Sequence, residues 1–102
     1  MPVFSTIRET LALGKKLSAS ELARALRFSI AAEYEAVQIY EQIIESIDDP
    51  QIKAVIMDIV QEEKVHAGQF IGVLFEVAPE EAKYYDQGTQ ENKKIKRRAT
   101  KA

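Results

Sequence analysis

Two glutamates and one histidine in this sequence have the side chains and the spacing of a metal site. Glu63 and His66 stand three residues apart in the segment "IVQEEKVHAGQF", and His66 is the only histidine of the chain. On a helix, residues at this spacing lie on one face, so a carboxylate and an imidazole can bind the same ion. Two such ligands cannot complete a metal site, so the pair needs further ligands from another element.

Two long helices are expected to position these residues. "SASE" at 18–21 has the pattern of a capping box, and no Gly or Pro follows it before Ile47. Asp49 and Pro50 then suit the N-cap and the first position of a second helix, which we expect to end at about Val77. Because only a tight turn separates the two helices, they form an antiparallel hairpin.

The remaining segments flank this hairpin. Pro79 opens a short third helix, "PEEAKYYDQ", and Gly88 is expected to end it as a C-cap residue. Residues 89–102 lack apolar periodicity and are expected to form a disordered basic tail or linker. The predicted organisation is an N-terminal arm at 1–17, an all-α domain at 18–88 and the tail at 89–102.

Each long helix carries apolar residues at alternating spacings of four and three, the pattern of a bundle seam. The seam residues are Leu22, Leu26, Ile30, Val37, Tyr40, Ile44 and Ile47 on the first helix, and Ile52, Ile56, Ile59, Phe70, Val73 and Val77 on the second. Glu33 interrupts the first seam, and Glu63 and His66 interrupt the second. In a hairpin that turns near residues 48–49, Glu33 faces position 64 or 65, so the three interruptions lie at one level.

Charged groups in an apolar seam need compensation. Burying a carboxylate costs several kcal/mol unless it is paired or binds a metal. Neither seam contains a Lys or Arg that could pair with Glu33 or Glu63. Taken singly, His66 reads as a hydrogen-bonded core histidine and each Glu as a surface residue, but the three together predict a metal site.

The predicted site is half of a larger one. A four-helix di-metal carboxylate site takes a Glu from each of two helices and a Glu-x-x-His from each of two others. One chain supplies half of this set, so a symmetric homodimer is expected to complete it. The oxygen-rich donors favour iron, with manganese as the alternative. Further apolar residues outside the seams indicate assembly beyond a dimer: Ala32, Ile39, Ile43, Val55, Val60, Ile71, Leu74 and Phe75.

Composition narrows the classes of function. The chain of 102 residues has no cysteine, which excludes thiolate zinc sites and rubredoxin-type iron centres within it. No apolar run is long enough for a membrane span, and no secretory signal is present, so we expect a cytoplasmic protein. Residues 89–102 carry six basic residues and one acidic residue, a balance of +5, which leaves −7 for residues 1–88 out of a net −2. The acidic body argues against a nucleic-acid partner.

The segments "EYEAVQIYEQ" (33–42) and "EEKVHAGQF" (62–70) resemble the encapsulated ferritins, ferritin-like proteins housed in encapsulin nanocompartments. They are also similar to minimal rubrerythrin-like half-bundles, and the resemblance covers residues 20 to 86. It implies that Glu33 is a terminal ligand of each iron, that Glu63 bridges the two irons, and that His66 binds through a ring nitrogen. It also implies a four-helix bundle formed by the homodimer, assembled into a ring-shaped decamer.

Two further residues match positions of this family. Tyr40 matches a tyrosine near the metal site, so it is expected to hydrogen-bond a metal ligand, and Glu35 matches one acid of a peripheral metal-uptake site. Ala32 stands where the family has the second acid of that site, so uptake through it is expected to be weaker. The ending "NKKIKRRATKA" does not resemble the apolar peptide by which family members dock to their shell. A domain fused to a shell protein, another mode of docking and a protein that is not cargo therefore remain open.

The expected function is that of a ferroxidase. Two Fe(II) ions at the shared site are oxidised to Fe(III) by O2 or peroxide, and the iron is passed on for storage in an encapsulin nanocompartment. One alternative is a rubrerythrin-like enzyme that reduces peroxide at the same site. Another is a helical dimerisation module without activity, in which the buried polar residues fix the register.

Overall fold

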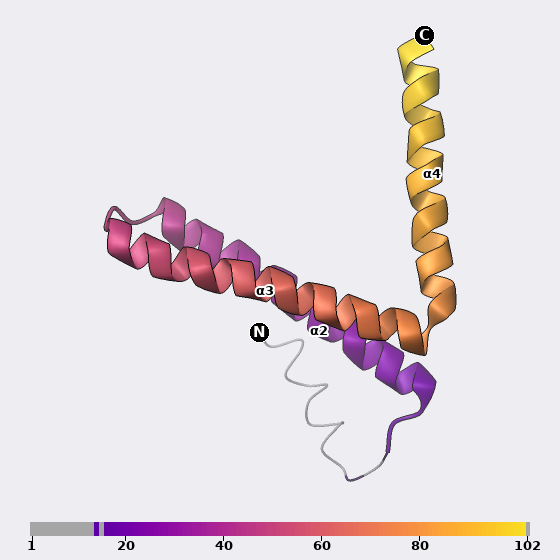
Figure 1. The fold of residues 1–102 in the computed structure, drawn as a ribbon, viewed down its shortest axis with the longest axis horizontal. Helices are drawn as coiled ribbons and strands as arrows, with labels where there is room; N and C mark the ends of the chain where they lie inside the picture. The colour runs from indigo at the N-terminus through magenta and orange to yellow at the C-terminus, as the bar shows by residue number, and fades with distance from the viewer. Residues whose placement is uncertain (1–13, 15, 102) are drawn as a thin grey trace.

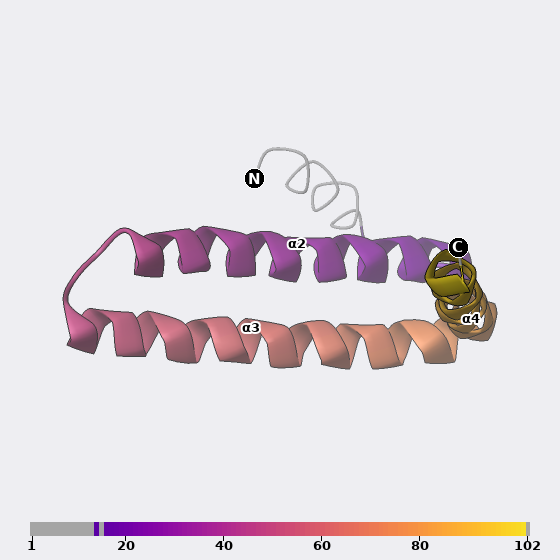
Figure 2. The ribbon, with the colours of Figure 1, turned by 90° about the horizontal axis from the view of Figure 1, so that it is seen from above.

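The computed structural model describes residue 14 and residues 16–101, which form three helices: α2 (Ala19–Glu45), α3 (Pro50–Val77) and α4 (Pro79–Lys101). Helices α2 and α3 lie side by side and antiparallel, and α4 leaves the end of α3 at a steep angle (Figures 1 and 2). The molecule is L-shaped, with extents of 47 × 47 × 21 Å. The predicted all-α hairpin is confirmed, whereas the predicted N-terminal arm falls largely outside the described residues.

Capping residues set where the hairpin helices begin. Ser18 accepts a hydrogen bond from the Glu21 amide at 3.1 Å, and the Glu21 carboxylate accepts one from the Ser18 amide at 3.0 Å, so the predicted capping box is confirmed. Asp49 caps α3 by accepting from the amides of Gln51 and Ile52 at 2.9 and 3.3 Å. These bonds satisfy donors that have no partner within a helix.

The two helices pack through a narrow line of small and medium side chains. Val60, Ala67 and Leu74, one heptad apart on α3, are only 1%, 4% and 2% exposed. Ala23 and Leu26 are the buried residues of α2, and they cluster with Leu74 near the open end of the hairpin. The core of a single chain is therefore thin, and much apolar surface stays uncovered.

This packing corrects the predicted seam of α3. Three residues assigned to the seam, Ile52, Ile59 and Val73, are instead 50%, 38% and 43% exposed. Two apolar stripes with a seven-residue repeat run along α3, and periodicity alone does not tell which of them faces α2. The stripe with the small Ala67 faces α2, because small side chains let two helices approach closely. Ile59, His66 and Val73 form the other stripe, on the open face.

A sharp elbow joins α3 to α4. Ala78 is the only residue between the two helices, and its φ of −134° and ψ of 73° lie outside the helical region. Pro79 explains this, because the ring of a proline disfavours helical conformation in the residue before it. The sequence therefore predicts correctly that a new helix begins at Pro79.

Side chains fix α4 at the elbow. The Arg27 guanidinium on α2 and the Tyr85 hydroxyl both donate hydrogen bonds to the Glu81 carboxylate on α4. The Arg27 and Tyr85 donors lower the pKa of Glu81, and the Glu81 carboxylate raises the pKa values of Arg27 and Tyr85. Phe75 packs on Tyr85 with ring centroids 5.8 Å apart. We call Arg27, Glu81 and Tyr85 the elbow latch.

The extent of α4 corrects a second prediction. Gly88 does not end the helix, and residues 89–101, expected to be disordered, continue it to Lys101. Gly inside a helix costs only about 1 kcal/mol relative to Ala, and the residues that follow are mostly good helix formers. Glu80 and Glu81 in the first turn, with Arg98 and Lys101 in the last, also complement the helix dipole.

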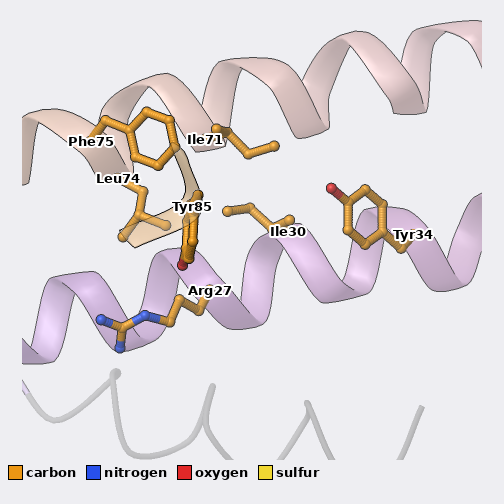
Figure 3. Close-up of a pocket in the computed structure, with 7 residues that line it drawn as sticks. All are labelled: Arg27, Ile30, Tyr34, Ile71, Leu74, Phe75 and Tyr85. Atoms are coloured by element: carbon orange, nitrogen blue, oxygen red, sulfur yellow. The ribbon is translucent and has the colours of Figure 1, made fainter. Parts of the chain in front are cut away.

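A groove lies beside the latch. Its volume is about 430 Å³, and it is lined by Arg27, Ile30, Tyr34, Ile71, Leu74, Phe75 and Tyr85 (Figure 3). The predicted metal ligands do not line this groove, so the groove is separate from the candidate site. In the described part of the chain, no helix combines the length and apolar content that a bilayer span requires.

Candidate metal centre

The structure brings Glu33, Glu63 and His66 together across the hairpin. Glu33 comes from the middle of α2 and the other two residues come from facing turns of α3, as the level of the three residues in the hairpin predicts. One ligand atom from each residue lies within 4.8 Å of the others. His66 Nδ1 is 3.8 Å from Glu33 Oε1 and 3.8 Å from Glu63 Oε2. These distances exceed those of hydrogen bonds but are within the range of an ion pair with a protonated histidine, so His66 lies close to both carboxylates without a hydrogen bond to either.

One buried oxygen of this cluster, Glu33 Oε2, has no hydrogen-bond partner in the described part of the chain. A buried carboxylate oxygen without a partner is costly, and native proteins rarely tolerate one. The donor set of two carboxylates and one imidazole fits a hard or intermediate divalent cation, which would supply the missing partner. The residues present therefore fit a metal ion.

The cluster is closed on one side and open on the other. The side chains of Glu33 and Glu63 are 17% and 21% exposed, while that of His66 is 48% exposed. His66 stands between Ile59 and Val73 in the open apolar stripe of α3, one heptad from each. Glu63, three residues earlier, lies beside this stripe on the next turn of α3 and is less exposed than His66. The ligands thus lie at the border between the hairpin interior and an uncovered apolar face.

The two remaining sequence-predicted residues lie outside this cluster. Tyr40 is half-buried on α2, seven residues after Glu33 and so on the same side of the helix. Glu35 is also half-buried, but a two-residue step turns it away from Glu33. The roles assigned to Tyr40 and Glu35 stay predictions.

Two other features of the hairpin, Ala67 beside the metal ligands and the elbow latch away from them, are not predicted from the sequence. Ala67, buried one residue after His66, allows α2 and α3 to approach closely near the cluster. An alanine in a helix carries no signal of its own, although its place one heptad after Val60 could have indicated it. The elbow latch joins residues far apart in the sequence, and no local pattern connects Arg27 with Glu81.

Comparisons with known proteins agree with this geometry. Residues 24–101 match the rubrerythrin family model. The chain is 32% identical over 81 residues to the ferritin-like–encapsulin shell fusion protein of Pyrococcus furiosus, covering 79% of this chain and 24% of that protein. It is 30% identical over 81 residues to the encapsulin nanocompartment cargo protein EncC of Myxococcus xanthus, covering 79% of this chain and 62% of that protein. The chain therefore spans less than two thirds of either curated relative.

A solved structure supports the relation over most of the fold. The encapsulated ferritin domain from Pyrococcus furiosus superposes with a TM-score of 0.79 at 31% identity, over 82% of this chain and 86% of that one. Identity and coverage of this size indicate common ancestry as well as a shared fold. The chain belongs to the rubrerythrin family of ferritin-like proteins and is homologous to the encapsulated ferritins.

Proposed function

We propose that this protein is a ferroxidase whose di-iron site forms between two copies of the chain. The observation that carries the proposal is the convergence of Glu33, Glu63 and His66 at the edge of an open apolar face, with one buried carboxylate oxygen unpartnered. Each chain offers half of the ligands of a four-helix di-metal site. A two-fold axis along this face brings the second half to the first.

The open face gives the second copy a surface to cover. Ile52, Ile59 and Val73 are all more than a third exposed along the stripe that holds His66. Pairing two such stripes removes apolar surface from water and turns two hairpins into a four-helix bundle. Burial of the His66 ring in this interface also places its nitrogen in a site from which bulk water is excluded.

The residues of the chain have separate tasks at the site. Glu33, one of whose two carboxylate oxygens is buried without a hydrogen-bond partner, holds a negative oxygen at a fixed position and needs no reorganisation to receive Fe(II). In the proposed dimer Glu63 would lie between the ligand sets of the two chains, where its carboxylate would hold both Fe(II) ions. His66 contributes a neutral nitrogen. Anionic oxygen ligands stabilise Fe(III) relative to Fe(II), so they favour loss of the electron.

The reaction balances with O2 as the oxidant. Two Fe(II) ions, the substrate, each lose one electron, and O2 accepts these two electrons and two protons to leave as H2O2. The cargo and shell-fusion relatives support a place inside an encapsulin nanocompartment, where the Fe(III) product would be stored. On this proposal the shell protein is a partner of the chain.

The rubrerythrin family match supports one second candidate, peroxide reduction at the same site. Here H2O2 accepts two electrons and two protons to give two molecules of water. The chain has no cysteine for a rubredoxin-type electron donor, so the electrons would come from Fe(II) itself. Anaerobic Fe(II) mixed separately with O2 and with H2O2 distinguishes the two, because the faster oxidant identifies the reaction.

Paired variants test the ferroxidase proposal. Glu63→Ala and His66→Ala should reduce Fe(II) oxidation to the rate without protein, while Glu62→Ala and Lys64→Ala, exposed neighbours on α3, should keep the wild-type rate. Native mass spectrometry under anaerobic Fe(II) titration should find two irons per dimer. Wild-type oxidation by Glu63→Ala and His66→Ala, or iron bound by isolated monomers, would refute the proposal.

A further inference from the structure

The distal part of α4 concentrates positive charge. Residues 92–101 carry six basic residues and no acidic one: Lys93, Lys94, Lys96, Arg97, Arg98 and Lys101. All six are exposed, and none forms a salt bridge with another residue that the structure describes. We call this segment, with its net charge of +6, the basic tip.

Five of these residues share one face of the helix. Lys93, Arg97 and Lys101 follow one another at steps of four, and Lys94 and Arg98 repeat this step one position later. Two adjoining hollows of about 360 and 460 Å³ open between the basic side chains. The first is lined only by cationic residues: Lys94, Arg97, Arg98 and Lys101. The second is lined by Lys93, Lys96, Arg97, Thr100 and Lys101. Because these cations repel one another, the hollows suit an anion that carries several phosphates.

The acidic body of the chain does not cancel this charge. Residues 1–88 carry a net charge of −7, which by itself argues against a nucleic-acid partner. α4 contacts the hairpin at the elbow and then leads away from it (Figure 1). At 1.5 Å per residue, Lys93 lies about 21 Å beyond Pro79 along the helix. This exceeds twice the Debye length of about 8 Å at physiological salt, so the charge of the hairpin is largely screened at the tip.

The helix itself indicates that the tip has a partner. Residues 86–101 are all exposed, and Ile95 is 54% exposed. A helical segment of this length without tertiary contacts is only marginally stable in water. Like charges at steps of four, such as Lys93 with Arg97 and Arg97 with Lys101, weaken it further. A polyanion bound along the tip removes this repulsion and should stabilise the helix.

The composition of the tip narrows the kind of polyanion. A helix that lies on an anionic membrane needs an apolar face, and Ile95 is the only large apolar residue of the tip. Single-stranded nucleic acid is held by stacking on aromatic side chains, which residues 92–101 lack. The major groove of duplex RNA is too narrow for side chains to enter. The major groove of B-form DNA is about 12 Å wide and admits one helix.

We propose that the basic tip binds duplex DNA through its phosphates, without preference for sequence. Each phosphate that a Lys or Arg neutralises releases condensed counterions, and this release drives the binding. The contact uses neither the metal ligands nor the open apolar stripe with His66, so it stands or falls independently of the ferroxidase proposal. An enclosing shell would keep duplex DNA away from the tip, so the contact belongs to copies of the chain outside a shell.

Fluorescence anisotropy measures this contact on the full-length, metal-free chain. The probe is a labelled DNA duplex of about 20 base pairs, and a duplex of unrelated sequence should bind equally well. Five phosphate contacts predict a slope of log K against log[NaCl] of about −4.5 for each bound tip, so binding should weaken about 500-fold between about 50 and about 200 mM. Far-ultraviolet circular dichroism should show a gain of helix when DNA is added.

Matched variants separate the tip from net charge. Arg97→Gln/Arg98→Gln removes two of the five contacts, so it should weaken binding at least about tenfold at about 50 mM NaCl and make the slope smaller by about 1.8. Lys16→Gln/Lys83→Gln makes the same change in net charge at exposed residues outside the tip and should bind within about twofold of wild type. Arg97→Lys/Arg98→Lys keeps the charge and should keep the binding.

Several results would overturn the proposal. Unchanged affinity of Arg97→Gln/Arg98→Gln, or equal weakening by Lys16→Gln/Lys83→Gln, would show that the tip is not the DNA-binding surface. Inorganic polyphosphate or duplex RNA that binds as tightly as DNA at equal phosphate concentration would assign the tip to polyanions in general. Tighter binding to vesicles with anionic lipid would assign it to membranes. Fe(II) oxidation by Arg97→Gln/Arg98→Gln should equal that of wild type, so failure of either proposal shows in its own assay.

Discussion

Glu33→Gln should have opposite effects on the metal-free and the iron-loaded protein. In the metal-free protein Glu33 Oε2 is a buried carboxylate oxygen without a partner. Glutamine has nearly the same shape but no charge, so the substitution removes the cost of burying that charge. With Fe(II) present the same carboxylate becomes a ligand, and its loss removes the gain from binding.

The structure sets the size of both effects. Leaving a buried polar group unsatisfied costs about 1–3 kcal/mol. Glutamine leaves a neutral polar group at the same place, and the Glu33 side chain is 17% exposed with His66 Nδ1 at 3.8 Å, so the substitution recovers only the part of the cost that comes from the charge, about 1 kcal/mol. In a domain of this size that corresponds to a rise in Tm of about 4–8 °C. Fe(II) at a hundred times its Kd would stabilise the wild type by about 2.7 kcal/mol and the variant by much less.

Thermal unfolding followed by circular dichroism measures this reversal. Melts at one fixed protein concentration, with chelator or with anaerobic Fe(II), should show Glu33→Gln melting above the wild type without metal and below it with metal. Glu62→Gln, which changes an exposed acid of α3, should shift the free energy of unfolding by less than about 0.5 kcal/mol in both conditions. If the two proteins keep the same order of Tm in both conditions, the metal-ligand reasoning is wrong. Equal wild-type Tm values with and without Fe(II) would favour the dimerisation module.

Three further predictions concern the fold and the interface. Arg27 and Tyr85 lower the pKa of Glu81, so the stabilisation from the elbow latch is complete above the ordinary carboxyl pKa and is lost as pH falls through the lowered value. Glu81→Gln should therefore lower Tm at neutral pH and make Tm less dependent on pH in the acid range. Val60→Ala, at 1% exposure, should cost about 2 kcal/mol in urea unfolding, whereas Val65→Ala, at 62%, should cost less than about 0.5 kcal/mol. Ile59→Glu/Val73→Glu should weaken dimerisation, measured by sedimentation equilibrium, because it places charge on the open stripe. The control Gln61→Glu/Gln69→Glu adds the same charge at polar positions and should weaken dimerisation less. Equal weakening by both pairs would argue against an apolar interface on this stripe.

Local signals predict most of the hairpin. The capping box at Ser18 and the Asp49–Pro50 pair identify the helix starts because capping depends on side chains a few residues apart. Glu33 lies at the same height along the hairpin as Glu63 and His66. This follows from the constant rise per residue of a helix and from the position of the turn, both of which can be taken from the sequence. Sequence therefore predicts the meeting of these three residues without knowledge of tertiary detail.

Predictions fail where non-local energies decide. The choice between the Ile59–Val73 stripe and the Val60–Leu74 stripe depends on how closely two backbones can approach, which periodicity does not encode. The continuation of α4 past Gly88 is likewise decided by propensity summed over a whole segment, which outweighs one unfavourable glycine. The ion pair between Arg27 on α2 and Glu81 on α4 forms only because the bend at Ala78 brings the start of α4 next to α2, and no local sequence pattern encodes that arrangement.

The one-residue elbow turns α4 into a lever. A helix of 23 residues is about 34 Å long, so each degree of rotation at Ala78 moves its far end by about 0.6 Å. A change of ten degrees thus displaces Lys101 by about 6 Å, more than the reach of an ion pair. Small substitutions at Ala78 or in the elbow latch would therefore move the exposed far end of α4 by several ångströms, while leaving the ligands of each half-site in place.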